Sequence, residues 1–234
     1  MLIGLLECDD VSGRFPDVDG GYREMFAALL SPHVPGIALR YYEAHRGQLP
    51  RSPGDCDAWL CTGSKYSVYE RRDWIDGLKA FVRRIGESAR PFVGICFGHQ
   101  MLASALGGDV AQAQQGWGVG IGGIDVLVQE PWMQPPRTRL RLHHMHADQV
   151  GRLPDGSVLL ARSAHCDVEM FRVGESMLGI EGHPEFTAPF AAALIRDRRD
   201  AIGAETADRA LESLRDPDDG PLVGAWIAAF LRRG

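Results

Sequence analysis

One cysteine near the middle of the chain lies in a setting typical of a nucleophile. Cys96 ends the apolar run PFVGIC at residues 91–96, and a helix-like segment follows at once. A buried strand, a sharp turn that carries a reactive side chain and a departing helix form a nucleophile elbow. Gly94 and Gly98 flank the cysteine and place no Cβ between strand and helix. A position near a helix N-terminus predicts a stabilised thiolate, the form of cysteine that attacks carbon.

A histidine and a glutamate far downstream could complete this chemistry. A cysteine nucleophile needs a base to take its proton and a third group to orient that base. His183 ends the apolar run MLGIEGH, and Glu185 follows two residues later. Residues i and i+2 of an extended segment point the same way, so the Glu185 carboxylate is expected beside the imidazole. There it would hold the ring tautomer and stabilise the imidazolium.

The elements around these residues predict an α/β fold. Apolar runs that read as strands alternate with segments of helical spacing, and this alternation favours a mainly parallel sheet covered on both faces. One predicted helix has Asp73 near its start and arginines late, as the helix dipole prefers. The expected strands span residues 1–7, 36–44, 56–63 and 91–96, and the expected helices span 22–32, 73–88 and 99–108.

The character of the chain changes after Gly116. Short strand-like runs at 118–128, 138–150, 156–163, 166–174 and 177–185 predict an antiparallel extension of the sheet. The tail at 189–203, 206–216 and 221–234 returns to helical spacing. Its residues Phe190, Trp226 and Phe230 are expected in the core, and the run RDRRD at 196–200 is expected to be a solvated helix face. With no repeat and no convincing linker, we expect one domain over residues 1–234.

Composition excludes several classes of function. The net charge is −6 and no basic run is present, so neither nucleic acid nor an anionic membrane is favoured as a partner. Apolar runs are too short for a membrane span, and the N-terminus has no basic region, so it predicts a strand rather than a signal peptide. Five cysteines without a C-x-x-C pair predict free thiols and a cytoplasmic protein. Apart from Cys96, they read as small structural residues.

The sequence as a whole resembles the class I, or triad, glutamine amidotransferase domains. This family includes the glutaminase part of GMP synthetase and stand-alone gamma-glutamyl peptidases. The resemblance covers nearly the whole chain and rests on CTGSKYSVYE, PFVGICFGHQMLASALGG, HADQV, LARSAHC and GIEGHPEF, at residues 61–70, 91–108, 146–150, 160–166 and 179–186. It implies a flavodoxin-like three-layer sandwich whose central sheet is mostly parallel and carries an antiparallel extension.

The resemblance also implies roles for particular residues. Cys96 matches the family nucleophile, His183 its base and Glu185 the orienting acid. Backbone N–H groups of Gly63 and Phe97 match the oxyanion hole, and Gln100, Met145 and His146 match residues around the substrate. The implied reaction cleaves the gamma-glutamyl amide of glutamine or of a gamma-glutamyl compound through a thioester on Cys96. It uses no cofactor or metal.

Two departures from the family pattern bear on the pocket. Lys65 follows Gly63-Ser64 where many relatives have a proline, so the loop loses a rigid residue. Glu181-Gly182 precedes the histidine where synthetase-linked domains usually have a glutamine and an aromatic residue. We expect a roomier or differently charged pocket wall, which argues against plain glutamine as the sole substrate.

Several alternatives stay open at this point. His144, His146 and Asp148, next to His143, would share one face of a strand and could bind a metal ion. The DJ-1-like proteins commonly have histidine directly after the cysteine, where this chain has Phe97, and α/β-hydrolases place the acid before the histidine. Three functions remain: a stand-alone hydrolase, an ammonia-donating subunit that needs a separate synthetase, and a binding protein without turnover.

Overall fold

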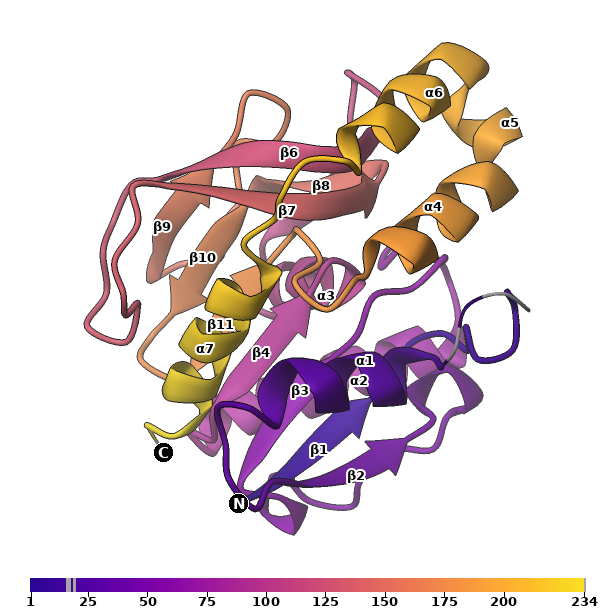
Figure 1. Ribbon diagram of the computed structural model, residues 1–234. Helices are drawn as coiled ribbons and strands as arrows, with labels where there is room; N and C mark the ends of the chain where they lie inside the picture. Colours follow the sequence, from indigo (N-terminus) through magenta and orange to yellow (C-terminus); the bar gives the residue numbers. More distant parts are fainter. Residues whose placement is uncertain (16–17, 19, 234) are drawn as a thin grey trace.

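The fold is built around one long mixed sheet (Figure 1). The computed structural model describes residues 1–15, 18 and 20–233. Within these residues, the main sheet has nine strands in the order β2-β1-β3-β4-β11-β10-β9-β6-β7. The first five of these run parallel to one another. They are β2 (Ala38–Tyr42), β1 (Leu2–Leu6), β3 (Ala58–Cys61), β4 (Phe92–Ile95) and β11 (Met177–Ile180).

The other four strands form the antiparallel extension that the sequence predicts. They are β10 (Met170–Val173), β9 (Ser157–Arg162), β6 (Gly118–Val126) and β7 (Arg139–His146). The run 177–185 was expected in this extension, but β11 pairs in parallel with β4 and forms the junction between the two parts. The run 138–150 was expected as one strand, yet its last three residues begin β8 (Asp148–Arg152), which lies in a separate small sheet. Its partner there, β5 (Asp109–Gln112), escaped the sequence analysis because it is short and mostly exposed.

Helices cover both faces of the sheet, which confirms the three-layer α/β architecture (Figure 1). One apolar core packs the sheet against α1 (Tyr22–Leu30), α4 (Ala188–Asp197) and α7 (Gly220–Leu231). The opposite core packs it against α2 (Asp73–Glu87) and α3 (Phe97–Ala105). Further short helices are α5 (Arg199–Ile202), α6 (Ala204–Ser213), η1 (Ala44–Arg46) and η2 (Pro53–Asp55). Phe190, Trp226 and Phe230 are each 1% exposed, so their predicted place in the core is confirmed.

The helix α2 shows how the sequence pattern produces these layers. Its buried residues Ile75, Leu78, Val82 and Ile85 recur every three or four positions and form one stripe. Asp73 lies in its first turn and Arg84 in its last, as the predicted dipole arrangement requires. The stripe faces the sheet, where the Phe81 ring meets Trp59 of β3 edge-on at a centroid distance of 5.0 Å.

The order of three adjacent strands brings the candidate site residues to one edge of the sheet. β4 has β3 on one side and β11 on the other, and all three run parallel. Their carboxyl ends therefore meet at one edge of the sheet, where ligands bind in open α/β sheets. Gly63 follows β3, Cys96 follows β4 and His183 follows β11. Three segments that are far apart in the sequence thus lie at the same edge of the sheet.

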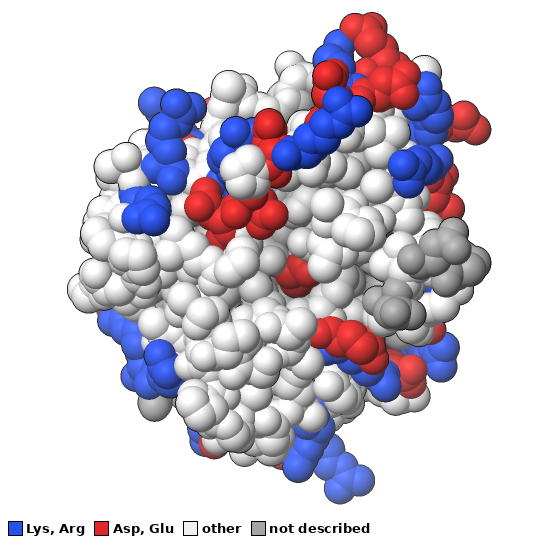
Figure 2. Space-filling view, viewed as in Figure 1, with Lys and Arg blue, Asp and Glu red and all other residues white. Residues whose placement is uncertain are grey.

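The composition disfavours membranes and nucleic acids as partners. Within the described part of the chain, no helix is long and apolar enough to cross a membrane. All five cysteines are buried and free. Figure 2 shows Lys and Arg interspersed with Asp and Glu on the visible face rather than gathered in one basic patch.

Candidate active site

The turn at Cys96 has the geometry of a nucleophile elbow. Cys96 has φ 51° and ψ −104° and immediately precedes α3. A non-glycine residue with positive φ is strained by about 1–3 kcal/mol, and such strain is typical of functional positions. A Cβ on Gly94 would lie 2.2 Å from the Gly98 carbonyl oxygen, and one on Gly98 would lie 2.4 Å from that of Cys61. The expectation that both glycines permit the close approach of strand and helix is confirmed.

The protonation state of Cys96 differs from the sequence-based expectation. Burial, followed by the nearby carboxylates of Glu181 and Glu185, raises the pKa of the Cys96 thiol well above its ordinary value. A hydrogen bond from the Phe97 backbone N–H acts in the opposite direction but is weaker. The predicted stabilised thiolate is therefore wrong for the resting protein, because desolvation and negative charge outweigh the helix N-terminus. The thiol needs a base to react.

His183 and Glu185 form a buried pair beside this turn. The His183 Nδ1 and the Glu185 Oε1 are 2.8 Å apart, and the two residues are 2% and 4% exposed. The imidazole stacks on the Phe186 ring at 3.9 Å between centroids and an interplanar angle of 13°. Its backbone N–H donates to the carbonyl oxygen of His143 at 2.7 Å. With Nδ1–H donated to the carboxylate, Nε2 is left as the basic nitrogen of the ring.

The segments that carry Cys96 and His183 are joined by the sheet. The Cys96 N–H donates to the carbonyl oxygen of Ile180, the last residue of β11, at 2.8 Å. A Cβ on Gly63 would lie 3.0 Å from His183 Cε1 and 2.9 Å from the Tyr22 hydroxyl oxygen. The structure therefore brings the loops after β3, β4 and β11 together, as the sequence analysis expects.

The loop that contains Gly63 is held by side chains rather than by a proline. The Thr62 hydroxyl donates to the Gly63 carbonyl oxygen at 3.0 Å and accepts from the Cys8 N–H at 3.0 Å. The Ser64 hydroxyl donates to the Cys8 carbonyl oxygen at 2.7 Å, and the Lys65 Nζ lies 2.8 Å from Asp9 Oδ1. These contacts tie the loop to the segment after β1, so the missing proline does not leave it unsupported.

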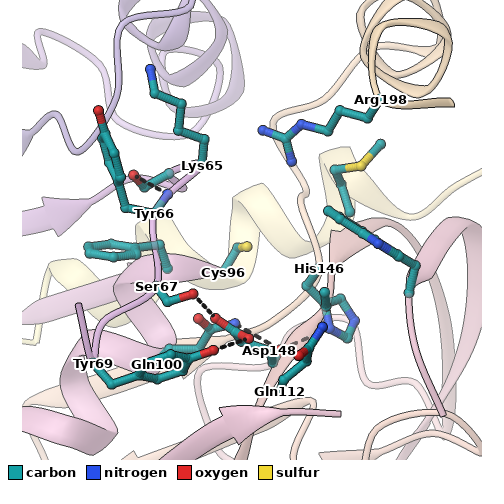
Figure 3. A pocket seen from close by; sticks show the side chains of 15 residues that line it. Lys65, Tyr66, Ser67, Tyr69, Cys96, Gln100, Gln112, His146, Asp148 and Arg198 are labelled. Carbon is teal, nitrogen blue, oxygen red and sulfur yellow. Dashed lines mark hydrogen bonds between the residues drawn. The ribbon is translucent and has the colours of Figure 1, made fainter. Parts of the chain in front are cut away.

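A pocket of about 330 Å³ opens beside Cys96 (Figure 3). Phe97 and the three residues matched to the substrate, Gln100, Met145 and His146, all line it. The Gln100 amide nitrogen donates to the Asp148 carbonyl oxygen at 3.0 Å and to the two Glu181 carboxylate oxygens at 3.0 and 3.3 Å. Gln100 thus connects the pocket lining to the Asp148 backbone and to the buried Glu181.

One end of the pocket carries a negative charge that the sequence analysis did not assign to substrate binding. The Asp148 carboxylate accepts hydrogen bonds from the Ser67 hydroxyl at 2.5 Å and the Tyr69 hydroxyl at 2.9 Å. All three side chains line the pocket and lie together in Figure 3. Ser67 and Tyr69 lie within a segment that supported the family resemblance, but their contact with Asp148 depends on the separate placement of β8.

The departure at Glu181-Gly182 does not change the pocket wall, contrary to expectation. Neither residue lines the pocket. Glu181 is fully buried under Gln100, and its Oε2 lies 3.5 Å from His99 Nε2. A Cβ on Gly182 would lie 3.0 Å from the Leu142 side chain, so this glycine serves close packing. Burial raises the pKa of Glu181 well above its ordinary value, so this side chain favours the protonated form more than an exposed glutamate does.

The histidines of β7 do not form the alternative metal site. The His144 Nε2 lies 3.0 Å from Glu169 Oε2, while the His146 Nδ1 lies 3.2 Å from the Asp148 backbone oxygen. Asp148 belongs to β8 in the other sheet, and its carboxylate is bound to Ser67 and Tyr69. The expected common face therefore does not exist. No group of three or more His, Cys, Asp or Glu within the described range could hold a metal ion.

The charged run 196–200 was expected to be a solvated helix face, but it is not continuous. The helix breaks at Arg198, between α4 and α5, and this residue is half-buried and lines the pocket. Tyr22 was also missed as a neighbour of the site, because its approach to Gly63 depends on how α1 packs on the sheet. Local sequence gives no signal that separates Arg198 from the exposed charges beside it.

Comparison with known proteins identifies the family of this arrangement. Residues 55–198 match the family model "Glutamine amidotransferase class-I". Gamma-glutamyl peptidase 4 of Arabidopsis thaliana is 31% identical over 175 residues, which cover 71% of this chain and 68% of the peptidase. One subunit of the glutamine-hydrolyzing GMP synthase of Methanoculleus marisnigri is 34% identical over 116 residues, 49% of this chain and 62% of that subunit.

A solved structure shows the same fold over the full length. A glutamine amidotransferase from Thermotoga maritima superimposes with a TM-score of 0.76 and 19% sequence identity, covering 99% of this chain and 96% of that one. The family model spans more than half of the chain, and the fold agrees with it. The chain belongs to the class I glutamine amidotransferase family.

Proposed function

We propose that the protein is a cysteine-dependent hydrolase that cleaves gamma-glutamyl amides through a thioester on Cys96. The observation that carries this proposal is the buried 2.8 Å contact between His183 and Glu185 at the end of the strand next to that of Cys96. Family membership and the similarity to gamma-glutamyl peptidases support the class of substrate. A cytoplasmic location, favoured by the five free cysteines, is part of the proposal.

The first half of the reaction forms the thioester. His183 Nε2 takes the proton from the Cys96 thiol while Nδ1–H stays bonded to Glu185. The sulfur attacks the side-chain carbonyl carbon of the gamma-glutamyl group, and the oxyanion accepts hydrogen bonds from the backbone N–H groups of Gly63 and Phe97. The C–N bond then breaks, and the imidazolium gives its proton to the leaving amine.

The second half of the reaction releases glutamate. His183 takes a proton from water, and the hydroxide attacks the thioester carbonyl carbon. The C–S bond breaks, and the imidazolium returns the proton to the Cys96 sulfur. Side chains and water complete this cycle without a metal ion or another cofactor. The elevated pKa of Cys96 fits the scheme, because the sulfur loses its proton when the base takes it rather than beforehand.

The pocket suggests how the glutamyl group is oriented. Its amino acid head carries an ammonium group, and the Asp148 carboxylate is a fitting partner for that charge. Gln100 and His146 lie next to Asp148, because both contact its backbone oxygen, and Met145 also lines the pocket. Figure 3 shows Cys96 between Asp148 and the end of the pocket with Lys65 and Arg198. With the head at Asp148, the gamma-carbonyl carbon would lie near Cys96 and the leaving amine beyond the sulfur.

A direct assay tests the proposal. The purified protein alone should release glutamate from gamma-glutamyl dipeptides or from glutamine, and the Cys96→Ala variant should release none while it keeps its melting temperature. A transient covalent adduct of the glutamyl mass on Cys96 should be visible by mass spectrometry after rapid acid quench. Turnover by the Cys96→Ala variant would show that the nucleophile has been assigned wrongly.

A second candidate is an ammonia-donating glutaminase subunit that acts with a separate synthetase. The similarity to the GMP synthase of Methanoculleus marisnigri favours it, although that match covers only 49% of this chain. Such a subunit would release little glutamate alone and far more when a synthetase and its substrates are added. A protein that binds gamma-glutamyl compounds with Cys96 intact but never turns them over would instead be a binding protein.

A further inference from the structure

The pocket beside Cys96 has charges of opposite sign at its two ends. Asp148 lies at one end, with Ser67 and Tyr69 bonded to it. Lys65 and Arg198 lie at the other, and Figure 3 shows Cys96 between the two ends. A substrate that spans this pocket would meet an acidic group on one side of the reacting sulfur and basic groups on the other.

The two basic residues differ in how they are paired. The Lys65 Nζ lies 2.8 Å from Asp9, so its charge is already matched by a buried carboxylate. Arg198 has no carboxylate oxygen within 4.0 Å among the residues that the structure describes. Its neighbours behave differently, since Asp197 pairs with Arg14 at 2.7 Å and Arg199 pairs with Asp208 at 2.5 Å. Judged by the described residues, Arg198 is therefore the basic residue of this pocket that is open to a negatively charged group.

The backbone and a neighbouring ring position Arg198 at the pocket. Its N–H donates to the Leu194 carbonyl oxygen at 3.1 Å, and its own carbonyl oxygen accepts from Ala201 and Ile202 at 3.0 Å each. The guanidinium lies 6.0 Å from the centroid of the Trp117 ring, and Trp117 also lines the pocket. Figure 3 shows the guanidinium directed into the pocket from the junction of α4 and α5.

The positive charge of Arg198 influences the pKa of the Cys96 thiol. Burial is the main influence on Cys96 and raises its pKa, but Arg198 acts on the same thiol in the opposite direction. It has the same effect on the buried Tyr22 hydroxyl, whose pKa burial raises. An arginine that acts on both groups through space can also meet a charge on a substrate bound at Cys96.

We infer that Arg198 binds the carboxylate of an amino acid leaving group, so that the preferred substrates are gamma-glutamyl amino acids with a free carboxylate next to the scissile amide. This inference rests on the proposed hydrolase. In such a substrate the carboxylate carbon is two bonds from the scissile nitrogen, so it must lie in the same pocket as Cys96. A guanidinium can donate two parallel hydrogen bonds to it. Glutamine, whose leaving group is ammonia, makes no such contact.

A matched pair of substrates tests this inference. Gamma-glutamylglycine and gamma-glutamylglycinamide differ only in the charge at the position assigned to Arg198. The wild-type protein should prefer the carboxylate, and Arg198→Ala should lower kcat/KM for it by about 10- to 100-fold, the range for a hydrogen bond to a charged group. The same variant should change kcat/KM for the glycinamide by less than about threefold. Arg198→Lys should restore part of the preference.

An exposed arginine in the last turn of α4 provides the control. Arg196 lies two residues earlier and is exposed, so Arg196→Ala should keep the wild-type ratio between the two substrates. Equal losses on both substrates in Arg198→Ala would overturn the inference, because the residue would then act on structure or on the glutamyl head. A wild-type protein that turns over both substrates without preference would also overturn it, while the proposed hydrolase would stand.

A binding measurement separates this inference from the fate of the proposed function. Titration calorimetry on Cys96→Ala, with and without Arg198→Ala, measures affinity for the two compounds without turnover. The dipeptide should bind about 10- to 100-fold more weakly when Arg198 is removed, and the glycinamide should not. Equal affinities would overturn the inference. Selective binding together with an inactive wild-type protein would instead overturn the hydrolase.

Discussion

A methyl group added at Gly94 should disable the elbow that presents Cys96. The Cβ of Gly94→Ala would lie 2.2 Å from the Gly98 carbonyl oxygen, 2.3 Å from its carbonyl carbon and 2.7 Å from the His99 nitrogen. Ordinary contacts begin near 3.4 Å, so strand and helix must separate by roughly 1 Å. All three obstacles are backbone atoms, which cannot move aside as a flexible side chain can. Cys96 and Phe97 lie between the two glycines and must move with them.

The size of the effect follows from this displacement. Overpacking a core costs about 1–3 kcal/mol, and a clash with backbone belongs at the upper end. At about 2–4 °C per kcal/mol for a protein of this size, the melting temperature should fall by about 6–12 °C. A displacement of 1 Å at reacting groups can cost about 100-fold in rate, and we expect glutamate release to fall by that order.

The assay combines calorimetric melting with glutamate release, and another glycine supplies the control. A Cβ on Gly151 in β8 would meet nothing within 4 Å, so Gly151→Ala should change stability by less than about 0.5 kcal/mol and leave activity unchanged. A Gly94→Ala variant that kept its activity and melted within about 2 °C of the wild-type protein, as Gly151→Ala should, would refute the close approach of strand and helix as the reason for glycine here.

Three further changes probe the site. Glu185→Gln replaces the carboxylate with a neutral amide, which does not stabilise the imidazolium and whose NH₂ group can favour the wrong tautomer of His183. We expect kcat to fall by about 100-fold or more with little change in KM. A loss below about threefold in steady-state kinetics would contradict the role of Glu185. Burial raises the pKa of Glu181, so this group stabilises the fold below its ordinary pKa of 4.5 and loses that contribution as pH rises through the folded value. Glu181→Gln should therefore gain stability relative to wild type as pH rises, and the pKa of its Cys96 thiol should be lower. Melting measures the stability and iodoacetamide alkylation measures the pKa of Cys96, both from about pH 5 to 9. Equal pH profiles of the two proteins would be the contrary result. Burial lowers the pKa of His99 from 6.5 to about 4, so the unfolded chain takes up a proton first and stability falls by about 3 kcal/mol as pH drops from 6.5 to 4. His99→Leu should flatten that slope in melts, and an unchanged slope would remove His99 as its cause.

Local sequence patterns were enough to place most elements and the pieces of the site. The apolar run before Cys96 and its flanking glycines predict the elbow, because strand propensity and the absence of a Cβ are properties of the residues themselves. The spacing of His183 and Glu185 predicts their contact, although the structure makes it through a turn at Pro184 and Glu185 rather than through the extended segment that was expected. The stripe of apolar residues in α2 likewise follows from helical periodicity alone.

The tertiary structure decided what depends on residues far apart in the chain. The parallel pairing of β11 with β4 joins segments that are distant in the sequence, and no local period encodes it. The break at Arg198 and the separate sheet of β8 decide which charges face the pocket. The protonation of Cys96 depends on its burial and on Glu181 and Glu185, which the fold gathers around it. Sequence sets the conformational preferences of short segments, whereas desolvation and charge interactions exist only once distant segments have packed together.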